Sequence, residues 1–493
     1  MFKTLNDLER FIKERGIATL DLKYSDLFGG WHHISLPASH ASAEVLQEGI
    51  GFDSSSTPGF KTLEAGDMVL LPDLTTAFMD PFWEAPTLSM ICNIAEADSK
   101  SLFGRDPRVI ARKAEEYLIS TGIADRSQWG PEFEFYIFED ANKAAPEVPG
   151  TFATWNGNSG NYADPAHALP SHGAYHAIPP QDQHHNLRAE ISRLLEEAGI
   201  GVNYHHHEVG CPSQQEIEVL LGPLTRMGDV SMMVKYFIKM TAKRHDKTAT
   251  FMPKPLYKEA GSGMHFHQHL FKGDQPLFYD ADGYGGLSKI ALSYIAGILA
   301  HGPALLALTN PSTNSYKRLV PGYEAPVNLF FSLANRSAAI RIPKYTQAPL
   351  EKRIEFRPPD ATCNPYLAMA AMLMAGIDGI KRKLDPQRLG FGPFDQNLFA
   401  PENVELKEEI KHLPASLDEA LYALEEDHQF LLEGDVFRPE IIETWIQYKR
   451  DREFVEVRNR PTPMNLCFIT TAEPSSGRSR CALSPKLGLL GEL

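Results

Sequence analysis

The chain has 493 residues, of which 43% are hydrophobic and 23% are charged, a composition typical of a globular protein with a large core. Its formal net charge of −15, without a long basic run, argues against general nucleic-acid binding. The sequence shows neither the charged-then-apolar pattern of a signal peptide nor an uncharged apolar stretch of about 18 residues that could span a bilayer.

The cysteines indicate a reducing compartment. They are widely spread and form no CxxC pair: Cys92, Cys211, Cys363, Cys467 and Cys481. This spacing favours free thiols over a disulfide framework or a zinc site. We therefore expect a cytoplasmic protein with no membrane partner.

The first hundred residues predict a small mixed domain in which strands predominate. Residues 4–15 carry apolar side chains on one stripe of a helix. Alternating polar and apolar residues predict strands at 19–24, 31–36, 67–71 and 89–94. A serine-rich loop at 52–60 lies between these strands, and by itself it is interpreted most simply as a turn.

The rest of the chain predicts one large α+β domain. Asp106 and Pro107 begin a helix that runs to about Ser120. Further helices are predicted at 184–199, 288–308, 364–383, 416–432 and 439–450. Residues 140–180 are rich in Gly, Asn, Pro and His and predict a long insertion. The expected parts are an N-terminal domain at 1–103, a large domain at 104–470 and a disordered tail at 471–493.

An alternating acidic segment, Gly130 to Phe138, carries the first chemical signal. Successive side chains of a strand point to opposite faces, so Glu132 and Glu134 share a face and repel each other unless a cation lies between them. Mg²⁺ and Mn²⁺ are the hard cations that carboxylates prefer. A solvated face of an edge strand would give the same pattern, so this pair alone leaves both interpretations open.

Three further segments offer carboxylate or imidazole groups from similar contexts. The groups are His205 to Glu208 with Glu216, then His265, His267 and His269 at a spacing of two, and finally Glu355 between Arg353 and Arg357. Together the four segments predict a site for two metal ions and an anionic substrate, as in a metal-dependent enzyme of phosphoryl transfer.

Long segments throughout the chain resemble bacterial type I glutamine synthetase. They follow the family's order from about residue 10 to 465 and comprise GPEFEF (130–135), HHHEV (205–209), KTATFMPKP (247–255), GSGMH (261–265), the flap-like segment 310–326, NRSAAIRIP (335–343) and RIEFRPPDATCNPYLA (353–368).

The resemblance implies a fold and a reaction. The fold class is α+β, with an N-terminal β-grasp-like domain and a C-terminal catalytic domain built on a curved antiparallel sheet. Twelve subunits form two hexameric rings, with each active site between neighbours. The reaction joins ammonia to the γ-carboxylate of glutamate, uses ATP and passes through γ-glutamyl phosphate, giving glutamine, ADP and phosphate.

The resemblance also implies two or three Mg²⁺ or Mn²⁺ ions per subunit. The substrate-side ion would be held by Glu134, Glu208 and Glu216. The ion that bridges the ATP phosphates would be held by Glu132, His265 and Glu355.

The same matches imply which residues bind phosphate, the amino-acid substrate and the nucleotide. Arg336, Arg341 and Arg353 match the arginines that face phosphate, a role for which the planar guanidinium is suited. The residues that match the amino-acid contacts are Gly261, Arg318 and Arg357. His207, His267 and His269 are assigned to the nucleotide, although a surface metal tract at 205–207 and a structural role for His267 are alternatives.

The ammonium site is implied by a third set of matches. Asp53, Ser56, Tyr175 and Glu208 match the pocket that attracts ammonium as a cation and removes its proton. Glu324 matches the flap glutamate that closes over the intermediate. In this context the serine-rich loop is interpreted as functional.

Five positions depart from the family pattern. Ala260 stands where a substrate-contacting asparagine is usual, Ser54 replaces a glycine, and the others are Asn203, His269 and Phe399. Phe399 occupies the place of the tyrosine that is adenylylated in relatives, and it has no hydroxyl to form the ester. Two alternatives remain: a γ-glutamyl-amine ligase with a polyamine acceptor, and a non-catalytic assembly protein.

Overall fold

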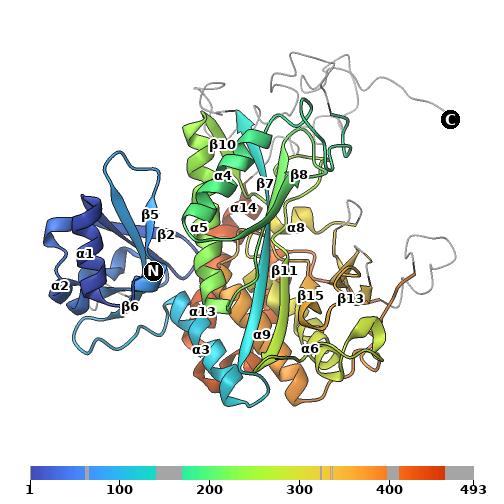
Figure 1. Ribbon diagram of the computed structural model, residues 1–493. Helices are drawn as coiled ribbons and strands as arrows, with labels where there is room; N and C mark the ends of the chain where they lie inside the picture. Colours follow the sequence, from blue (N-terminus) through green and yellow to red (C-terminus); the bar gives the residue numbers. More distant parts are fainter. Residues whose placement is uncertain are drawn as a thin grey trace, which may run out of the picture.

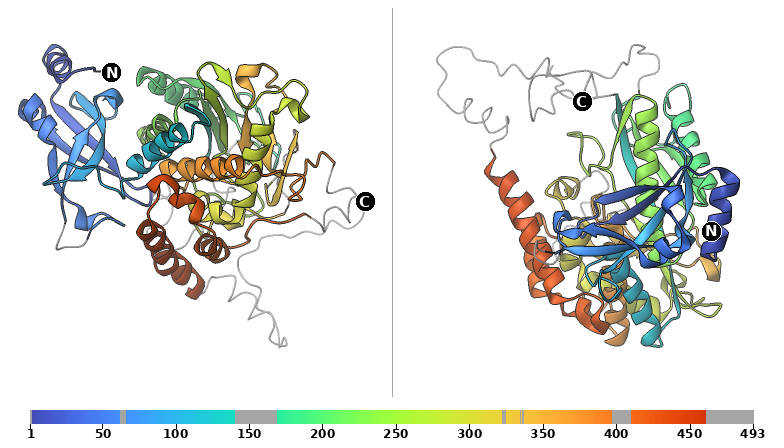
Figure 2. Two further views of the ribbon diagram at one scale, coloured as in Figure 1. Left: turned by 90° about the horizontal axis from the view of Figure 1, so that it is seen from below. Right: turned by 90° about the vertical axis from the view of Figure 1, so that its left-hand side faces the viewer.

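The computed structural model describes residues 2–61, 66–139, 169–321, 325–333, 335, 337–396 and 410–460. A small N-terminal domain lies to one side of a large domain, as Figures 1 and 2 show. The three described cysteines, Cys92, Cys211 and Cys363, are buried and form no disulfide with one another.

The N-terminal domain is a six-stranded sheet with two short helices. Its strands follow the order β2-β1-β6-β4-β3, with β5 paired to β6, and β1 runs parallel to β6. The elements are α1 (Leu5–Arg15), β1 (Thr19–Ser25), β2 (Trp31–Pro37), η1 (Ala38–His40), α2 (Ala43–Glu48), β3 (Ile50–Asp53), η2 (Ser54–Ser56), β4 (Asp67–Pro72), η4 (Leu74–Thr76), β5 (Phe78–Asp80) and β6 (Thr87–Glu96).

The large domain is built on a nine-stranded sheet. The strand order is β13-β14-β15-β11-β7-β9-β8, with β10 paired to β7 and β12 paired to β11. The strands are β7 (Arg126–Glu139), β8 (Val202–His207), β9 (Gln214–Val219), β10 (Lys247–Thr250), β11 (Phe266–Lys272), β12 (Gln275–Pro276), β13 (Asn328–Leu333), β14 (Ala338–Ile342) and β15 (Ile354–Phe356). Neighbouring strands are antiparallel except for the parallel pair β13 and β14.

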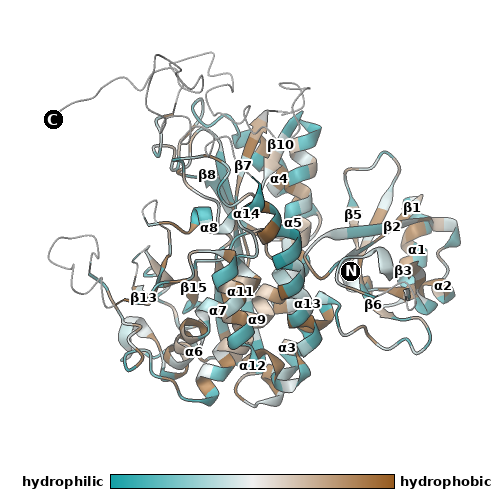
Figure 3. Ribbon diagram, turned by 180° about the vertical axis from the view of Figure 1, so that it is seen from behind, coloured by the Kyte–Doolittle hydropathy of each residue, from teal (hydrophilic) through white to brown (hydrophobic). Residues whose placement is uncertain are grey.

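Helices cover one face of this sheet, and Figure 3 shows α5, α9, α11 and α13 gathered on the side seen from behind. The α-helices are α3 (Pro107–Ser120), α4 (His185–Glu197), α5 (Leu224–Arg244), α6 (Lys289–Ala300), α7 (Gly302–Thr309), α8 (Ser315–Arg318), α9 (Pro365–Lys381), α11 (Leu417–Glu426), α12 (Gln429–Leu432), α13 (Pro439–Lys449) and α14 (Val455–Asn459). Shorter turns are η8 (Tyr284–Gly286), η9 (Pro349–Glu351), η11 (Glu433–Asp435) and the π-helical turn η12 (Arg450–Phe454). Helix α9 is buried from Pro365 to Ile377, because α3, α5, α6 and α7 all pack against it.

Two predicted helices are interrupted in the structure. The helix expected at 288–308 consists of α6 and α7, which meet at His301 with a bend of 72°. Pro303 lacks the N–H that a continuous helix would need there. The helix expected at 416–432 is divided into α11 and α12 around Asp427. Among the described residues no single helix has the length and apolar composition to cross a membrane. Helices α6 and α7 have that length and composition only when they are counted together, as this bent pair.

His301, at the corner between α6 and α7, joins three helical segments. Its Nδ1 lies 2.8 Å from an oxygen of Asp427, its Nε2 lies 2.9 Å from Asp378, and its ring stacks on Phe430 with 3.9 Å between centroids. Burial alone would lower the pKa of His301, but the two carboxylates outweigh burial and raise it. A charged imidazole therefore holds this corner to α9 and α11.

We predict that His301→Gln lowers the free energy of unfolding by about 1–3 kcal/mol near pH 6, because two charge-assisted hydrogen bonds are lost. The folded-state pKa is raised, so the contribution is complete below the ordinary histidine pKa of about 6.5 and disappears as pH rises through the folded value. Urea unfolding at several pH values measures this.

The control is His245→Gln, which removes a more exposed pair with Glu190 at 2.6 Å and should change stability by less than about 1 kcal/mol. An effect of His301→Gln that is equal at pH 6 and pH 9 would contradict a charged His301.

Candidate active site

Strand pairing in the large sheet brings the predicted ligands to one face. In the pair β7 and β9, Glu134 lies opposite Glu216 and Glu132 lies opposite Glu218. In the pair β11 and β15, His267 lies opposite Glu355. Directly opposed residues of an antiparallel pair point to the same side of a sheet. The register alone therefore assembles buried carboxylates and imidazoles from four strands.

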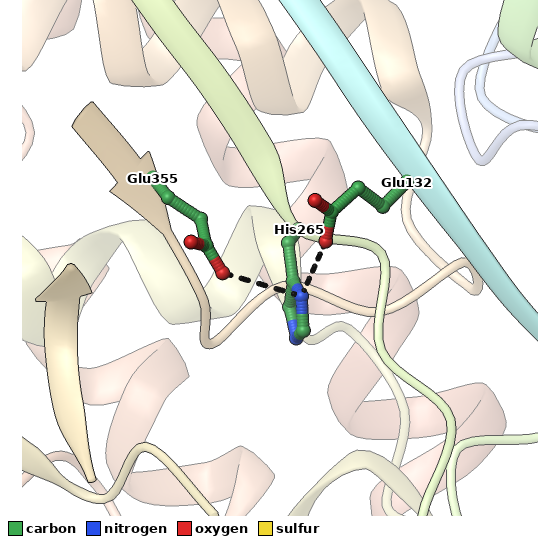
Figure 4. Close-up of side chains that lie close together, drawn as sticks. All are labelled: Glu132, His265 and Glu355. Carbon is green, nitrogen blue, oxygen red and sulfur yellow. Dashed lines mark hydrogen bonds and ion pairs between the residues drawn. The ribbon is translucent and has the colours of Figure 1, made fainter. Parts of the chain in front are cut away.

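The first group comprises Glu132, His265 and Glu355, which Figure 4 shows pointing toward one another. The Nδ1 atom of His265 lies 2.9 Å from Glu132 Oε2 and 3.6 Å from Glu355 Oε1. All three residues are buried, and each offers a ligand atom within 4.8 Å of the others. One oxygen or nitrogen from each residue could thus bind the same cation.

A second group shares Glu132 and adds Glu218 and His267. His267 Nε2 lies 2.7 Å from Glu132 Oε1, whereas the buried Oε2 of Glu218 accepts no hydrogen bond from any described residue. Burial raises the pKa of Glu218, and the nearby charge of Glu132 raises it further. The unpaired oxygen of Glu218 is what a cation-binding group would provide.

The third group comprises His206 of β8, Glu208 directly after β8, and Glu216 of β9. His206 Nε2 is 3.3 Å from Glu216 Oε2. The ring of Tyr175 contacts that of His206 edge-on at 5.4 Å and stacks on His176 at 4.0 Å. Tyr175 therefore lies beside His206 of this group.

Glu134 lies between the first and third groups without belonging to either. Its Oε2 accepts a hydrogen bond of 2.7 Å from the backbone N–H of Gly263, and its Oε1 lies 3.9 Å from His265 Nε2. On the adjacent strand Glu134 faces Glu216, so it borders both sets of ligands.

The pKa shifts of the groups show how strongly their buried charges interact. Burial raises the pKa of Glu216 well above its usual value, and the carboxylates of Glu132, Glu134, Glu208 and Glu218 raise it further. The pKa of Glu132, in contrast, is lowered well below its usual value. Burial would raise it, but the neighbouring His267 and His265 outweigh burial. Carboxylate oxygen with one imidazole suits Mg²⁺ or Mn²⁺.

Arginines surround Glu355 on its other side. Arg341 Nη1 donates to one Glu355 oxygen at 2.6 Å, and Arg357 Nε donates to the other at 3.0 Å. Arg353 Nε donates to His267 Nδ1 at 3.2 Å. Arg341 and Arg353 both lie over the ring of Tyr345, at 5.9 and 5.8 Å from its centroid. The sheet thus places guanidinium groups next to the possible cation sites, where phosphate oxygens could bind both.

Arg318 lies against His265, and two neighbouring glycines leave room for its side chain. Its Nη2 lies 3.2 Å from His265 Nε2, and its Nη1 donates to the carbonyl of Pro358 at 2.7 Å. A Cβ at Gly261 would lie 2.7 Å from Arg318 Cγ, and one at Gly263 would lie 2.4 Å from Arg318 Nη2. A Cβ at Gly261 would also lie 2.6 Å from the backbone carbonyl oxygen of Pro253, so this position of the GSGMH segment needs glycine.

The remaining histidines have different surroundings. Both ring nitrogens of His207 lie near backbone carbonyls, of Glu208 at 2.7 Å and of Pro212 at 3.2 Å. Burial lowers the pKa of His269 to about 4, and its Nδ1 has no hydrogen-bond partner among the described residues. His269 is therefore a neutral ring on β11, edge-on to Phe271.

Asp53 and Ser56 lie apart from these groups. They belong to β3 and η2 of the N-terminal domain, and Asp53 is exposed. Ser56 lines a cavity of about 440 Å³ together with Tyr448 and Arg452 of the C-terminal helices. Within one chain, residues 55–61 line this cavity together with helical residues of the large domain, and none of the three ligand groups includes Asp53 or Ser56.

Comparison with known proteins extends these observations to the whole chain. The domain described as "Glutamine synthetase, catalytic domain" matches residues 104–469, and "Glutamine synthetase, beta-Grasp domain" matches residues 16–97. The chain belongs to the glutamine synthetase family. The predicted α+β fold, with a β-grasp domain followed by a glutamine synthetase catalytic domain, is confirmed.

Individual members of the glutamine synthetase family align over nearly the full length. A glutamine synthetase of Frankia alni is 47% identical over 470 residues, covering 94% of this chain and 98% of that protein. One of Aquifex aeolicus is 47% identical over 458 residues, covering 92% and 96%. A solved structure of Plasmodium falciparum glutamine synthetase has a TM-score of 0.84 at 30% identity and covers 94% and 98%.

The structure places most of the predicted site residues but not all of them. Glu324, Arg336 and Phe399 lie outside the described residues, and the roles of all the predicted site residues stay predictions. Sequence reasoning did not assign Glu218 to the site, although it lies two residues after Glu216 in a strand and therefore shares its face. His206, to which the sequence analysis assigned no ligand role, lies with its Nε2 3.3 Å from a Glu216 oxygen.

We predict that Mn²⁺ binding to the protein releases protons, because carboxylates with raised pKa values such as Glu216 must ionise to bind a cation. Calorimetric titration in two buffers of different ionisation enthalpy measures the number of protons. Free Mn²⁺ at 100 times its Kd should raise the free energy of unfolding by about 2.7 kcal/mol.

Glu216→Gln should reduce both the proton release and the Mn²⁺ affinity. Glu197→Gln, on the exposed side of α4, is the matched control and should leave both unchanged. Unaltered binding in Glu216→Gln would remove this residue from the cation site.

Proposed function

We propose that the chain catalyses the ATP-dependent ligation of ammonia to the γ-carboxylate of glutamate through γ-glutamyl phosphate. The observation that carries the proposal is the Glu132, His265 and Glu355 group, flanked by Arg341 and Arg357, in a member of this family. Bound divalent cations would neutralise the phosphate charge during transfer. A non-catalytic assembly protein would have no need of these buried carboxylates.

The arrangement of charge assigns roles to the chain's own residues. Glu132, His265 and Glu355 would hold the cation on the ATP side, and Glu134, Glu208 and Glu216 the one on the glutamate side. Glu218, which forms a group with Glu132 and His267, would provide a further carboxylate oxygen on the ATP side.

Guanidinium groups would bind the two anionic substrates. Arg341 and Arg353, with Arg336, would face the phosphates, while Arg318 and Arg357 would bind glutamate beside Gly261. Each of the described arginines lies next to a ligand residue: Arg341 and Arg357 contact Glu355, Arg353 contacts His267, and Arg318 contacts His265. His267 and His269 lie on the same strand, β11, and would face the nucleotide.

Ammonium would be bound by Asp53, Ser56, Tyr175 and Glu208, and Glu324 would close over the intermediate. Hydrogen bonds from the side chain and the backbone N–H of Ser55 lower the pKa of Asp53, which is therefore ionised at neutral pH. An ionised carboxylate attracts ammonium as a cation before its proton is removed.

Two departures bear on the choice of acceptor. Ser54 is buried and donates to the carbonyl of Gly66 at 2.9 Å, and the carbonyl of Ala260 accepts from Tyr136 at 2.7 Å. Both residues thus form hydrogen bonds within the chain. Ammonia is preferred over a polyamine because relatives named glutamine synthetase are 43–47% identical over 92–94% of the chain.

We predict ADP release that depends on glutamate and on ammonium, with putrescine supporting little of the rate. Glu355→Gln should lower kcat about 100-fold or more, because it weakens the cation site on the ATP side. A coupled ADP assay with each acceptor measures both. Glu351→Gln, an exposed carboxylate four residues earlier in the chain, is the control and should retain the wild-type rate.

A preference for putrescine would replace ammonia ligation by amine ligation. ADP release that is the same in Glu355→Gln and in the wild type would contradict the assignment of the cation site.

We also propose that neighbouring subunits of a dodecamer complete each site, because Asp53 lies apart from the ligand groups of its own chain. Mixed oligomers of Asp53→Ala and Glu324→Ala subunits, each inactive alone, should then regain activity at about one quarter of the sites, the product of two independent halves. Activity after co-refolding, with hybrids verified by native mass spectrometry, tests this. Hybrid oligomers without activity would show that one chain builds the whole site.

A further inference from the structure

A cavity of about 570 Å³ lies outside the ligand groups, beside the first turn of α6 and the segment that follows α9. Its volume falls within the range of about 300–1,000 Å³ that is usual for small-molecule sites. The residues that line it are Tyr284, Lys289, Ile290, Leu292, Ser293, Phe331, Ile380, Lys383, Leu384, Asp385, Pro386, Gln387 and Pro393. None of them has a part in the proposed reaction.

Most of the cavity wall is apolar. Ile290 and Leu292 come from α6, Phe331 from β13, and Ile380 and Leu384 from the end of α9 and the residues after it. Such a surface excludes water and favours an apolar ligand body by about 25 cal/mol per Å² buried.

The charged residues at the cavity favour an anion. Lys289 and Lys383 are exposed, and neither forms an ion pair with another residue in the described part of the chain. Lys289 is the first residue of α6, whose N-terminus adds a partial positive charge. Both lysines are thus available to a negative group.

The side chains of Asp385 and Ser293, which also line the wall, already have partners. Asp385 accepts from the backbone N–H of Gln387 at 2.9 Å and pairs with Arg388 at 3.5 Å. Ser293 donates to the carbonyl of Leu384 at 2.8 Å. The backbone N–H groups of Lys383 and Leu384 satisfy carbonyls in the last turn of α9. Asp385 is thus paired with Arg388, and Asp395 is bonded to the wall residue Tyr284 at 2.7 Å, whereas Lys289 and Lys383 have no ion pair among the described residues.

We propose that this cavity binds a small amphiphilic anion, with its carboxylate or sulfonate at Lys289 and Lys383 and its apolar body against Ile290, Phe331 and Leu384. The site is separate from the ligand groups on the sheet, and it does not depend on the proposed reaction. A neutral or cationic molecule with the same apolar body binds more weakly, because two lysines would then be left without a counter-charge.

The test uses the intact oligomer and the fluorescent anion 8-anilino-1-naphthalenesulfonate, titrated in the presence of saturating Mg²⁺ and ATP so that the nucleotide site is filled. Displacement is then measured with octanoate, 1-octanol and octylammonium, which share one chain and differ only in the head group. Octanoate should displace the probe at concentrations at least about tenfold lower than the other two.

Two variants localise the binding. Lys289→Gln with Lys383→Gln should weaken octanoate about tenfold, whereas the control Lys243→Gln, an exposed lysine on α5, should not. Ile290→Trp should fill the cavity and abolish binding of both ligands. If Ile290→Trp does not fold, the double lysine variant decides alone.

Equal displacement by octylammonium, or undiminished octanoate binding in the double lysine variant, would overturn the proposal. The same holds if the probe does not bind once ATP is present, because its binding would then belong to the nucleotide site.

Discussion

The register of the strands in the large sheet brings negatively charged side chains together, and the structure of the catalytic domain depends on this constraint. Pairing of β7 with β9 places Glu132, Glu134, Glu216 and Glu218 on one face, and Glu355 joins them from β15. Buried carboxylates without counter-charges would cost several kcal/mol each. The surrounding imidazoles and guanidiniums offset part of this cost, and divalent cations would offset the rest. The large sheet is thus a rigid frame that keeps repelling groups together.

A second buried ion cluster fixes the N-terminal domain relative to that frame. The Arg108 guanidinium donates to Asp229 of α5 at 2.8 Å, to Asp73 at 2.6 Å and to Asn93 at 2.6 Å. Asn364, which caps α9, donates to the carbonyl of Leu27 at 3.1 Å. These bonds leave the two domains little freedom to rotate. The direction in which each chain presents its Asp53 loop is therefore built into the junction.

Local patterns predicted much of this structure, because they depend on neighbours in sequence. The alternation at Gly130 to Phe138 identified β7 and its paired carboxylates, and Asp106 caps α3 as predicted, accepting from the Arg108 N–H at 2.9 Å. What the sequence left open depends on distant contacts. The corner at His301 follows from partners 77 and 126 residues away, and Glu218 joins the site only because β9 lies beside β7.

The same reasoning links the cavity behind α6 to the sheet. Asp395 accepts hydrogen bonds from Tyr284 at 2.7 Å, from Ser332 at 2.7 Å and from the Leu333 N–H at 3.0 Å, and these bonds outweigh burial and lower its pKa. Tyr284 forms part of the cavity wall, while Ser332 lies opposite Arg341 in the β13 and β14 pair. Arg341 in turn contacts Glu355. One carboxylate thus bonds both to the wall of the cavity and to the strand beside the predicted phosphate site.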